Sequence, residues 1–387
     1  MKANYLMPTR ILMGENCLRD QRAFLAPLGK KACIITGKNS ARACGAYDDA
    51  VKALEANGQG FYVYDQVMSN PTDSCVYEAG AAAKREGCDF ILAIGGGSPM
   101  DAAKAAAVLA VNDLSKEELF ELAFTTALPI AAVPTTAGTG SETTPYSILV
   151  DTTGADGKSP RQGGPVKRSL GGPLLFPRFA FLDARYTRRL NRDTTVHTAI
   201  DALSHAVESA LTPRASRLSD VLARESAVMI RDCFAALLDF PADPAEFPLE
   251  IREKLLLAAS MAGMAIAQTG TTVVHSMGYH FTLDWGTDHG RANGLLMGPF
   301  LSWCEEKERE AAAAGTALAP RIPGLRAALG LDLEEFRGIL EKLLGKREKA
   351  GEAELAAWGA AKMKNAANTY IQPTQEEIDR IFREAVG

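Results

Sequence analysis

Short apolar runs alternate with longer amphipathic segments through the first half of the 387-residue chain. The apolar, β-branched runs cover residues 31–37, 60–65, 90–97 and 128–136. The segments between them, which have helix-like patterns, cover residues 47–58, 72–87 and 100–113. Strands that alternate with helices predict a parallel sheet covered by helices on both faces. Further strand-like runs at residues 146–150 and 179–184 flank a Gly- and Pro-rich predicted loop at 151–167.

The pattern changes near residue 185. Strand patterns end there, and long segments rich in Ala, Leu and Met follow with helical periodicity, at residues 194–211, 214–239, 251–269 and 290–313. We therefore expect an α/β N-terminal domain at residues 1–185 and an all-α C-terminal domain at residues 186–387.

Composition excludes several classes of protein. Hydrophobic residues make up 47% of the chain and charged residues 23%, which is ordinary for a globular protein. The net charge of −5 and the lack of a basic block exclude nucleic acid as a partner. No apolar run reaches the roughly 18 residues that a membrane span needs, and the N-terminus does not resemble a signal peptide. The seven scattered cysteines predict reduced thiols, so we expect a cytoplasmic protein.

A glycine-rich turn follows the third predicted strand, in the sequence AIGGGSPMD. The glycines Gly95, Gly96 and Gly97 let the backbone turn tightly, and Ser98 adds a donor at the start of the next helix. Backbone N–H groups at a helix N-terminus favour a pyrophosphate. Ser98 and Asp101 also have the spacing of a helix capping box, so a turn without a ligand stays open.

Hydroxyl side chains follow the fourth predicted strand, in VPTTAGTGSE. Thr135, Thr136 and Thr139 lie there among glycines, and Asn70 ends another strand. The carboxyl ends of parallel strands meet at one edge of the sheet, where ligands bind in such folds. A polar turn without a ligand is the alternative, but two such loops in succession favour a dinucleotide-binding domain.

The end of the first predicted strand bears on the choice of dinucleotide. Sites that prefer NAD usually place an acidic residue near the end of an early strand, where it binds the ribose hydroxyls. Gly37 occupies that place here, followed by Lys38 and, two residues later, Ser40. No carboxylate would repel a 2′-phosphate, so we expect NADP(H) in preference to NAD(H).

Four side chains in the second half have the chemistry of metal ligands. Asp201 and His205 are four residues apart in an apolar helical segment, so they share one helix face. His275 and His289 are fourteen residues apart, roughly 21 Å in a continuous helix, and they meet only if the chain reverses near Gly286. One oxygen and three nitrogen ligands suit Fe(II) or Zn(II). Each histidine could instead be a hydrogen-bonded core residue, and Asp201 could cap a helix or pair with an arginine.

Taken in order, these motifs resemble the iron-containing (group III) alcohol dehydrogenases. The resemblance spans essentially the whole chain and rests on GGGSPMD, PTTAGTGSE, DALSHAVE and HSMGYHFTLDWGTDHG. It implies that Asp201, His205, His275 and His289 bind a metal. It also implies that the protein is a homodimer. It also implies cofactor contacts at Asn70, Gly96, Gly97, Ser98, Asp101, Thr135, Thr136 and Thr139. Lys167 best matches a lysine that approaches the cofactor ribose in the family.

Two positions depart from the family pattern. Many members carry a histidine four residues after the third ligand, where this chain has Tyr279, which could donate a proton or serve only in packing. His280, one position further, is turned about 100° around a helix and is a poor substitute. Asp288 stands where a proline often precedes the last ligand.

The resemblance and the residues together predict hydride transfer between NAD(P)(H) and a small alcohol or aldehyde, with the metal as Lewis acid. A glycerol dehydrogenase or maleylacetate reductase activity on the same scaffold is one alternative. A metal-dependent hydrolase would leave the Gly/Thr loops unexplained. A catalytically silent nucleotide-binding protein is the alternative from another class.

Overall fold

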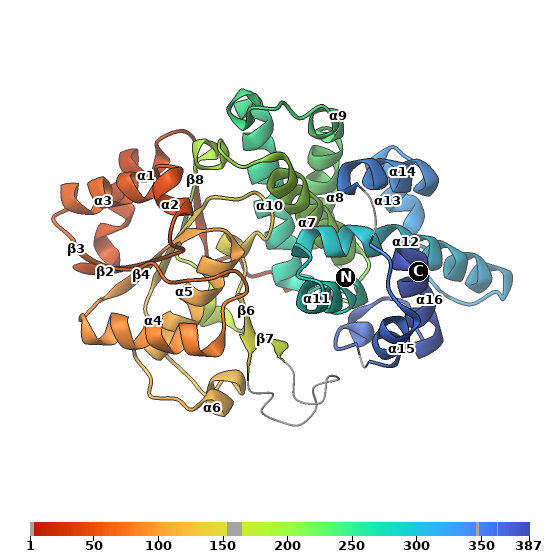
Figure 1. Cartoon of the computed structure of the whole chain (residues 1–387), viewed down its shortest axis with the longest axis horizontal. Helices are drawn as coiled ribbons and strands as arrows, with labels where there is room; N and C mark the ends of the chain where they lie inside the picture. The colour runs from red at the N-terminus through yellow and green to blue at the C-terminus, as the bar shows by residue number, and fades with distance from the viewer. Residues whose placement is uncertain (1–3, 153–164, 346–347, 362) are drawn as a thin grey trace. The chain divides into compact units, whose positions relative to one another are not determined.

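The computed structural model describes residues 4–152, 165–345, 348–361 and 363–387 (Figure 1). The chain forms two compact units. The sheet unit comprises Leu6–Leu190 together with Asp243–Gly263. The helical unit comprises Asn191–Ala242 and Met264–Gly387, together with the first residues of the chain. The boundary between the two units therefore lies at residues 190–191, five residues after the expected domain boundary. Residues 243–263 belong to the sheet unit, although the segments on either side of them belong to the helical unit.

A six-stranded parallel sheet forms the centre of the sheet unit, in the order β1-β8-β5-β4-β2-β3. Its strands are β1 Arg10–Met13, β2 Lys31–Thr36, β3 Gly60–Tyr64, β4 Phe90–Gly95, β5 Ile130–Pro134 and β8 Phe179–Leu182. Five of them lie where the apolar runs predict strands. β1 was missed because its sequence, RILM, has only three consecutive apolar residues. The predicted α/β class is confirmed.

Helices cover the strands of this sheet on both faces. They are α1 Cys17–Asp20, α2 Ser40–Ala43, α3 Ala46–Ala56, α4 Asp73–Arg85, α5 Gly97–Leu109 and α6 Lys116–Phe120. Alternate strand residues enter two separate cores, with Cys33 and Ile35 on one side and Ala32 and Ile34 on the other. Because both sides are buried, these strands are apolar throughout.

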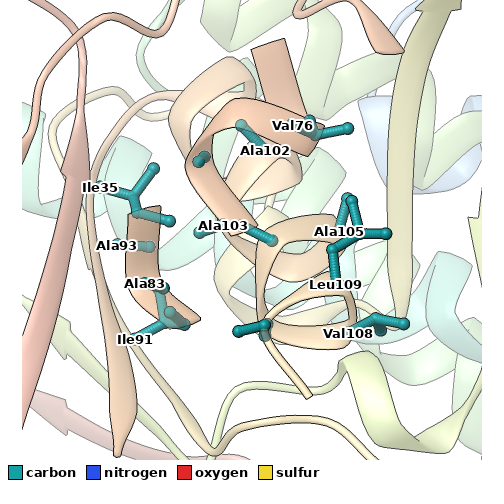
Figure 2. Packing of buried hydrophobic residues seen from close by; sticks show 14 of the residues in the cluster. Ile35, Val76, Ala83, Ile91, Ala93, Ala102, Ala103, Ala105, Val108 and Leu109 are labelled. Atoms are coloured by element: carbon teal, nitrogen blue, oxygen red, sulfur yellow. The ribbon is translucent and has the colours of Figure 1, made fainter. Parts of the chain in front are cut away.

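The alanine-rich helix α5 packs closely on one side of the sheet. Figure 2 shows strand residues Ile35 and Ile91 beside Ala103 of α5. Gly80 of α4 permits a second close contact, because a Cβ there would lie 2.5 Å from Cβ of Leu109. This packing holds the N-terminus of α5 at the end of β4, where the glycine-rich turn lies.

A separate antiparallel hairpin joins β6 Tyr146–Asp151 to β7 Val166–Gly171. The predicted loop at 151–167 overlaps both strands at its ends, because Asp151 pairs with Val166 and Val150 with Lys167. The rest of that loop, residues 153–164, lies outside the described residues.

The helical unit contains no strand within the residues described, as the periodicity predicts. Its helices are α7 Arg192–Ala210, α8 Arg217–Arg231, α9 Phe234–Leu238, α11 Val273–Asp284, α12 His289–Ala313, α13 Ile322–Leu329, α14 Leu333–Leu344, α15 Glu352–Ala360 and α16 Gln375–Val386. Helix α10, Leu249–Thr269, belongs to the sheet unit up to Gly263 and to the helical unit beyond it.

Among the described residues, no single helix has the length and apolar character for a membrane span. The bent pair of α10 and α11, with 115° between the helices, meets those criteria only when the two are taken together.

Candidate metal centre and nucleotide-binding loops

One face of α7 carries three buried polar residues. Asp201, His205 and Glu208 follow one another at spacings of four and three residues, so they lie on the same side of the helix. Their exposed fractions are 3%, 5% and 1%. Burial of this many charged or polar groups in an alanine-rich helix requires partners on the neighbouring helices.

Glycines bring α12 against α7 close to these residues. A Cβ at Gly290 would lie 1.8 Å from the carbonyl oxygen of His197, and one at Gly294 would lie 2.7 Å from Cγ2 of Ile200. Any larger residue would push the two helices apart. Because His289 immediately precedes Gly290, this close approach also places His289 near Asp201.

The four predicted ligands form one cluster in the helical unit. Nε2 of His205 and Nε2 of His275 are 2.9 Å apart, and ligand atoms of Asp201, His205 and His275 all lie within 4.8 Å of one another. Nε2 of His289 is 3.9 Å from Oδ1 of Asp201. Between His275 and His289 the chain reverses, since α11 ends at Asp284 and Gly286 has a φ of 67°.

Asn293 lies among these ligand atoms and was missed from the sequence. Its Nδ2 is 3.1 Å from Oδ1 of Asp201 and 3.3 Å from Nε2 of both His275 and His289. An amide nitrogen carries two hydrogens, so it cannot donate to three acceptors at once. The cluster therefore holds more lone pairs than Asn293 satisfies, and its donor set fits a divalent cation such as Fe(II) or Zn(II).

Glu208 is a second residue that the sequence analysis missed. Its Oε1 contacts Nδ1 of His275, and its Oε2 accepts hydrogen bonds from the backbone N–H and the hydroxyl of Thr272, at 2.7 and 2.6 Å. The available signal was its position on the same helix face as Asp201 and His205. A carboxylate behind a ligating histidine is a common arrangement in metal sites.

The departures from the family pattern have distinct surroundings. The ring of Tyr279 stacks on that of His289, with centroids 5.5 Å apart and planes 22° apart. His280 lies instead against Trp358 and Phe382, so it does not replace the absent histidine. Oδ2 of Asp288 accepts a hydrogen bond from Nδ1 of His197 at 2.8 Å. This contact links the start of α12 to α7.

In the sheet unit, the glycine-rich turn joins β4 directly to α5. Gly96 is the N-cap residue of α5, with no side-chain hydrogen bond at the cap, so the capping box that Ser98 and Asp101 could form is absent. The hydroxyl of Ser98 instead accepts a hydrogen bond from the backbone N–H of Asn70 at 3.2 Å. Asn70 has a φ of 54°, a conformation that asparagine tolerates better than most residues.

The second loop packs directly on these glycines. A Cβ at Gly96 would lie 3.0 Å from Oγ1 of Thr136, and one at Gly97 would lie 2.7 Å from Cγ2 of Thr139. Thr135 donates its backbone N–H to the carbonyl of Gly95 at 3.0 Å. The predicted residues of the two loops are therefore brought together at the N-terminus of α5, an arrangement that favours an anion.

Asp101 lies in α5, four residues after Gly97, and its partners are protein atoms. Its Oδ1 accepts a hydrogen bond from the hydroxyl of Ser141 at 2.8 Å and its Oδ2 from the backbone N–H of Ile148 at 3.1 Å. Both carboxylate oxygens thus have protein partners, and burial raises the pKa of Asp101. Its contact with a cofactor stays a prediction.

Lys104 completes this arrangement and was also missed from the sequence. It is fully buried, and its Nζ donates to Oγ of Ser141, Oγ1 of Thr144 and the carbonyl of Tyr146, at 2.7, 3.2 and 2.7 Å. Burial lowers the pKa of this ammonium group to about 8. We call Asp101, Lys104, Ser141 and Thr144 the Lys104 cluster.

The two remaining predicted cofactor residues lie elsewhere in the sheet unit. Gly37 directly follows β2, and Asp65, which directly follows the adjacent strand β3, pairs with Arg42 at 3.9 Å. Lys167 lies in β7, and its charge opposes the rise in the pKa of Asp101.

A parallel sheet with two glycine and threonine loops, together with a buried Asp/His cluster, is typical of metal-dependent oxidoreductases that use a dinucleotide. The family model for iron-containing alcohol dehydrogenase matches residues 8–184, and the model for the C-terminal part of the same family matches residues 195–323. The chain belongs to the iron-containing alcohol dehydrogenase family. It is therefore an oxidoreductase that acts on CH–OH groups, interconverting alcohols and aldehydes.

Individual relatives agree with this assignment. The chain is 30% identical to a probable alcohol dehydrogenase of Escherichia coli, over 87% of this chain and 82% of the relative. It is 27% identical to the NAD-dependent methanol dehydrogenase of Bacillus methanolicus, over 76% and 74% of the two chains. The crystal structure of an iron-containing alcohol dehydrogenase from Thermotoga maritima is similar with a TM-score of 0.86 and 35% identity, covering 100% of this chain and 99% of the other.

Proposed function

We propose that the protein interconverts small aldehydes and alcohols with Fe(II) held by Asp201, His205, His275 and His289, and with NADP(H) as the hydride carrier. The observation that carries the proposal is the convergence of these four side chains, from α7, α11 and α12, with their nitrogen and oxygen atoms turned toward one another. When bound there, the metal supplies a Lewis acid for the substrate oxygen.

The protein's own groups bind and orient the dinucleotide in this proposal. The first N–H groups of α5 and the hydroxyls of Thr136 and Thr139 would hold the pyrophosphate, and Gly96 and Gly97 let the threonine loop pack against the N-terminus of α5. Lys167 would approach the ribose. A bound cofactor would supply or accept the hydride, so no side chain would have to act as a nucleophile.

Metal analysis combined with an activity screen tests this proposal. Protein purified without oxygen should contain iron and should oxidise NADPH when short aldehydes are added. Protein treated with a chelator should lose turnover and regain it with Fe(II). Tight binding of NADPH without turnover by the iron-loaded protein would instead support a silent nucleotide-binding protein.

The preference for NADP(H) has its own support and its own test. Gly37 leaves no carboxylate at the end of β2, Lys38 and Ser40 beside it are exposed, and the nearby Asp65 is paired with Arg42. The relative from Bacillus methanolicus is named as NAD-dependent, so the proposed preference for NADP(H) would be a difference between this chain and that relative. Gly37→Asp should lower the ratio of kcat/KM for NADPH over NADH by about tenfold or more, through repulsion of the 2′-phosphate. Gly37→Ala controls for the added Cβ, which would lie 3.2 Å from the carbonyl of Val67.

Tyr279 is proposed as the residue that moves a proton to or from the substrate oxygen. Its ring lies against His289, a proposed ligand, and its side chain is half-buried. Tyr279→Phe keeps the stacked ring and removes only the hydroxyl, so it should lower kcat by about 10² or more and flatten the pH profile of kcat. A variant with unchanged kcat would leave Tyr279 with a packing role only.

A homodimer in the cytoplasm is the remaining part of the proposal. The dimer rests on the family resemblance, and the location rests on the seven scattered cysteines, which predict reduced thiols. Light scattering on the purified full chain tests the dimer, and fractionation of cells tests the location.

A further inference from the structure

We call Asp201, His205, His275 and His289 the ligand cluster. Glu208 is a buried carboxylate that lies behind this cluster rather than inside it. It is 1% exposed, and its two oxygens have different partners. Oε1 contacts Nδ1 of His275, whereas Oε2 accepts both hydrogen bonds from Thr272. A carboxylate buried this completely, with three hydrogen-bonding contacts, has a defined orientation.

The contact with His275 determines which ring nitrogen is available to a metal. An ionised carboxylate only accepts hydrogen bonds, so the proton of a neutral His275 lies on Nδ1. Its Nε2 then carries a lone pair. That lone pair lies on the side of the ring that faces Nε2 of His205, 2.9 Å away.

The contact with Thr272 determines where α11 begins. Thr272 is the N-cap residue of α11, and His275 lies in the first turn of that helix. Glu208 holds the backbone N–H at this N-terminus, where a negative charge is also favoured by the helix dipole. One carboxylate of α7 therefore fixes both the first turn of α11 and the ring that this turn presents.

We propose that Glu208 is a positioning residue for the metal: it fixes the tautomer and orientation of His275 and so increases the affinity of the site. This inference rests on the proposed function, because it presumes that the cluster binds a metal. The competing role is purely structural, in which Glu208 only anchors the N-terminus of α11 through Thr272.

The test is Co(II) binding to the full chain and to Glu208→Gln, measured by visible absorption and by competition with a chelator. Glutamine keeps the size and can still accept from Thr272, but its NH₂ group would then face Nδ1 of His275 and favour the wrong tautomer. We expect Co(II) to bind about 10- to 100-fold more weakly, with an altered visible spectrum.

Two further variants separate the roles. Glu225→Gln, at an exposed position of α8, makes the same change of charge away from the cluster and should bind Co(II) like the wild type. Thr272→Val removes one hydrogen bond from Oε2 and leaves the His275 contact. It should lower the melting temperature with little change in Co(II) affinity.

Each outcome has a separate meaning. If Glu208→Gln binds Co(II) with wild-type affinity and spectrum, and only its melting temperature falls, the structural role is correct and the inference is overturned. If Glu208→Gln does not fold, Glu208→Asp replaces it, with a shorter carboxylate that should weaken Co(II) binding; unchanged affinity there overturns the inference equally. Wild-type protein that binds neither Co(II) nor Fe(II) overturns the proposed function itself.

Discussion

Two buried polar clusters in this protein are built in opposite ways. In the Lys104 cluster, three protons of one ammonium group meet three acceptors, and both oxygens of Asp101 accept hydrogen bonds. In the ligand cluster, by contrast, three imidazole rings and the carboxylate of Asp201 face one another. The amide nitrogen of Asn293 lies within 3.3 Å of the carboxylate and of two of the rings. The first cluster is complete with protein atoms alone. The second brings together groups that can all be metal ligands, which a cation would balance.

This difference shows how the partners of a buried polar group indicate its role. A buried polar group whose partners are all protein atoms supports the fold, whereas a group of converging lone pairs indicates a ligand. The difference predicts that the two clusters respond differently to substitution: the ligand cluster should lose metal and activity, and the Lys104 cluster should lose stability.

The largest effect is expected for Asp201→Asn, which removes the charge of a proposed ligand while keeping its shape. Its activity should fall by about 10³ or more, since several kcal/mol of charge stabilisation is lost, and its metal content should fall with it. Without metal, the variant should be at least as stable as the metal-free wild type, because the substitution removes one of the acceptors that face one another in the ligand cluster.

Metal analysis, turnover and urea unfolding of the metal-free proteins measure these three quantities. Ser204→Ala is the matched control, at a buried neighbour on α7 whose hydroxyl bonds only the carbonyl of Asp201 among the contacts described. It should keep its metal. A fully active Asp201→Asn with normal metal content would contradict the ligand role of Asp201.

The contrast between the clusters also shows what the sequence could and could not predict. Strand and helix patterns were sufficient for the α/β and all-α organisation, and spacing was sufficient to select His205 and Asp201. Spacing could not predict the partners of Asp101, because these come from residues 141 and 148, far along the chain. Only the structure shows that both oxygens of Asp101 have protein partners. Lys104 and Glu208 were missed because a charged residue in a helix is usually exposed, and nothing local reveals that it is buried.

The next largest effect is expected for Lys104→Met. The change removes the Lys104 donor to Ser141, Thr144 and Tyr146 and the larger of the two lysine charges that act on Asp101, so the free energy of unfolding should fall by about 3 kcal/mol. Urea unfolding of the metal-free protein at pH 7 measures it. A variant as stable as the wild type would show that the Lys104 cluster does not support the fold.

Lys104 also has a signature in the pH dependence of stability. Its pKa is about 8 in the folded protein against an ordinary value of 10.5. Between these two pH values the unfolded chain holds a proton that the folded chain has released, so the free energy of unfolding rises with pH across this window. Below about pH 8 both states are protonated and the slope vanishes. Asp101 and Glu142 are the charged groups that act on Lys104.

The measurement is the difference between the unfolding free energies of the wild type and Lys104→Met from pH 7 to 10.5. Subtraction removes the tyrosines and cysteines that titrate in the same window. The wild type should gain stability relative to the variant as the pH rises. A constant difference would show that Lys104 titrates at its ordinary pKa.

The smallest effect is expected for Gly97→Ala, which tests the nucleotide loops without touching either cluster. The new Cβ would lie 2.7 Å from Cγ2 of Thr139, so the two loops must separate slightly and the N-terminus of α5 loses its alignment with a pyrophosphate. NADPH should bind about tenfold more weakly, or about 1.4 kcal/mol, in a fluorescence titration. Thr139→Ser removes Cγ2 but keeps a hydroxyl for the hydrogen bond from the backbone N–H of Ser141. The double variant should therefore regain most of the lost affinity, whereas additive losses would mean that Gly97 is required for a reason other than contact with Thr139.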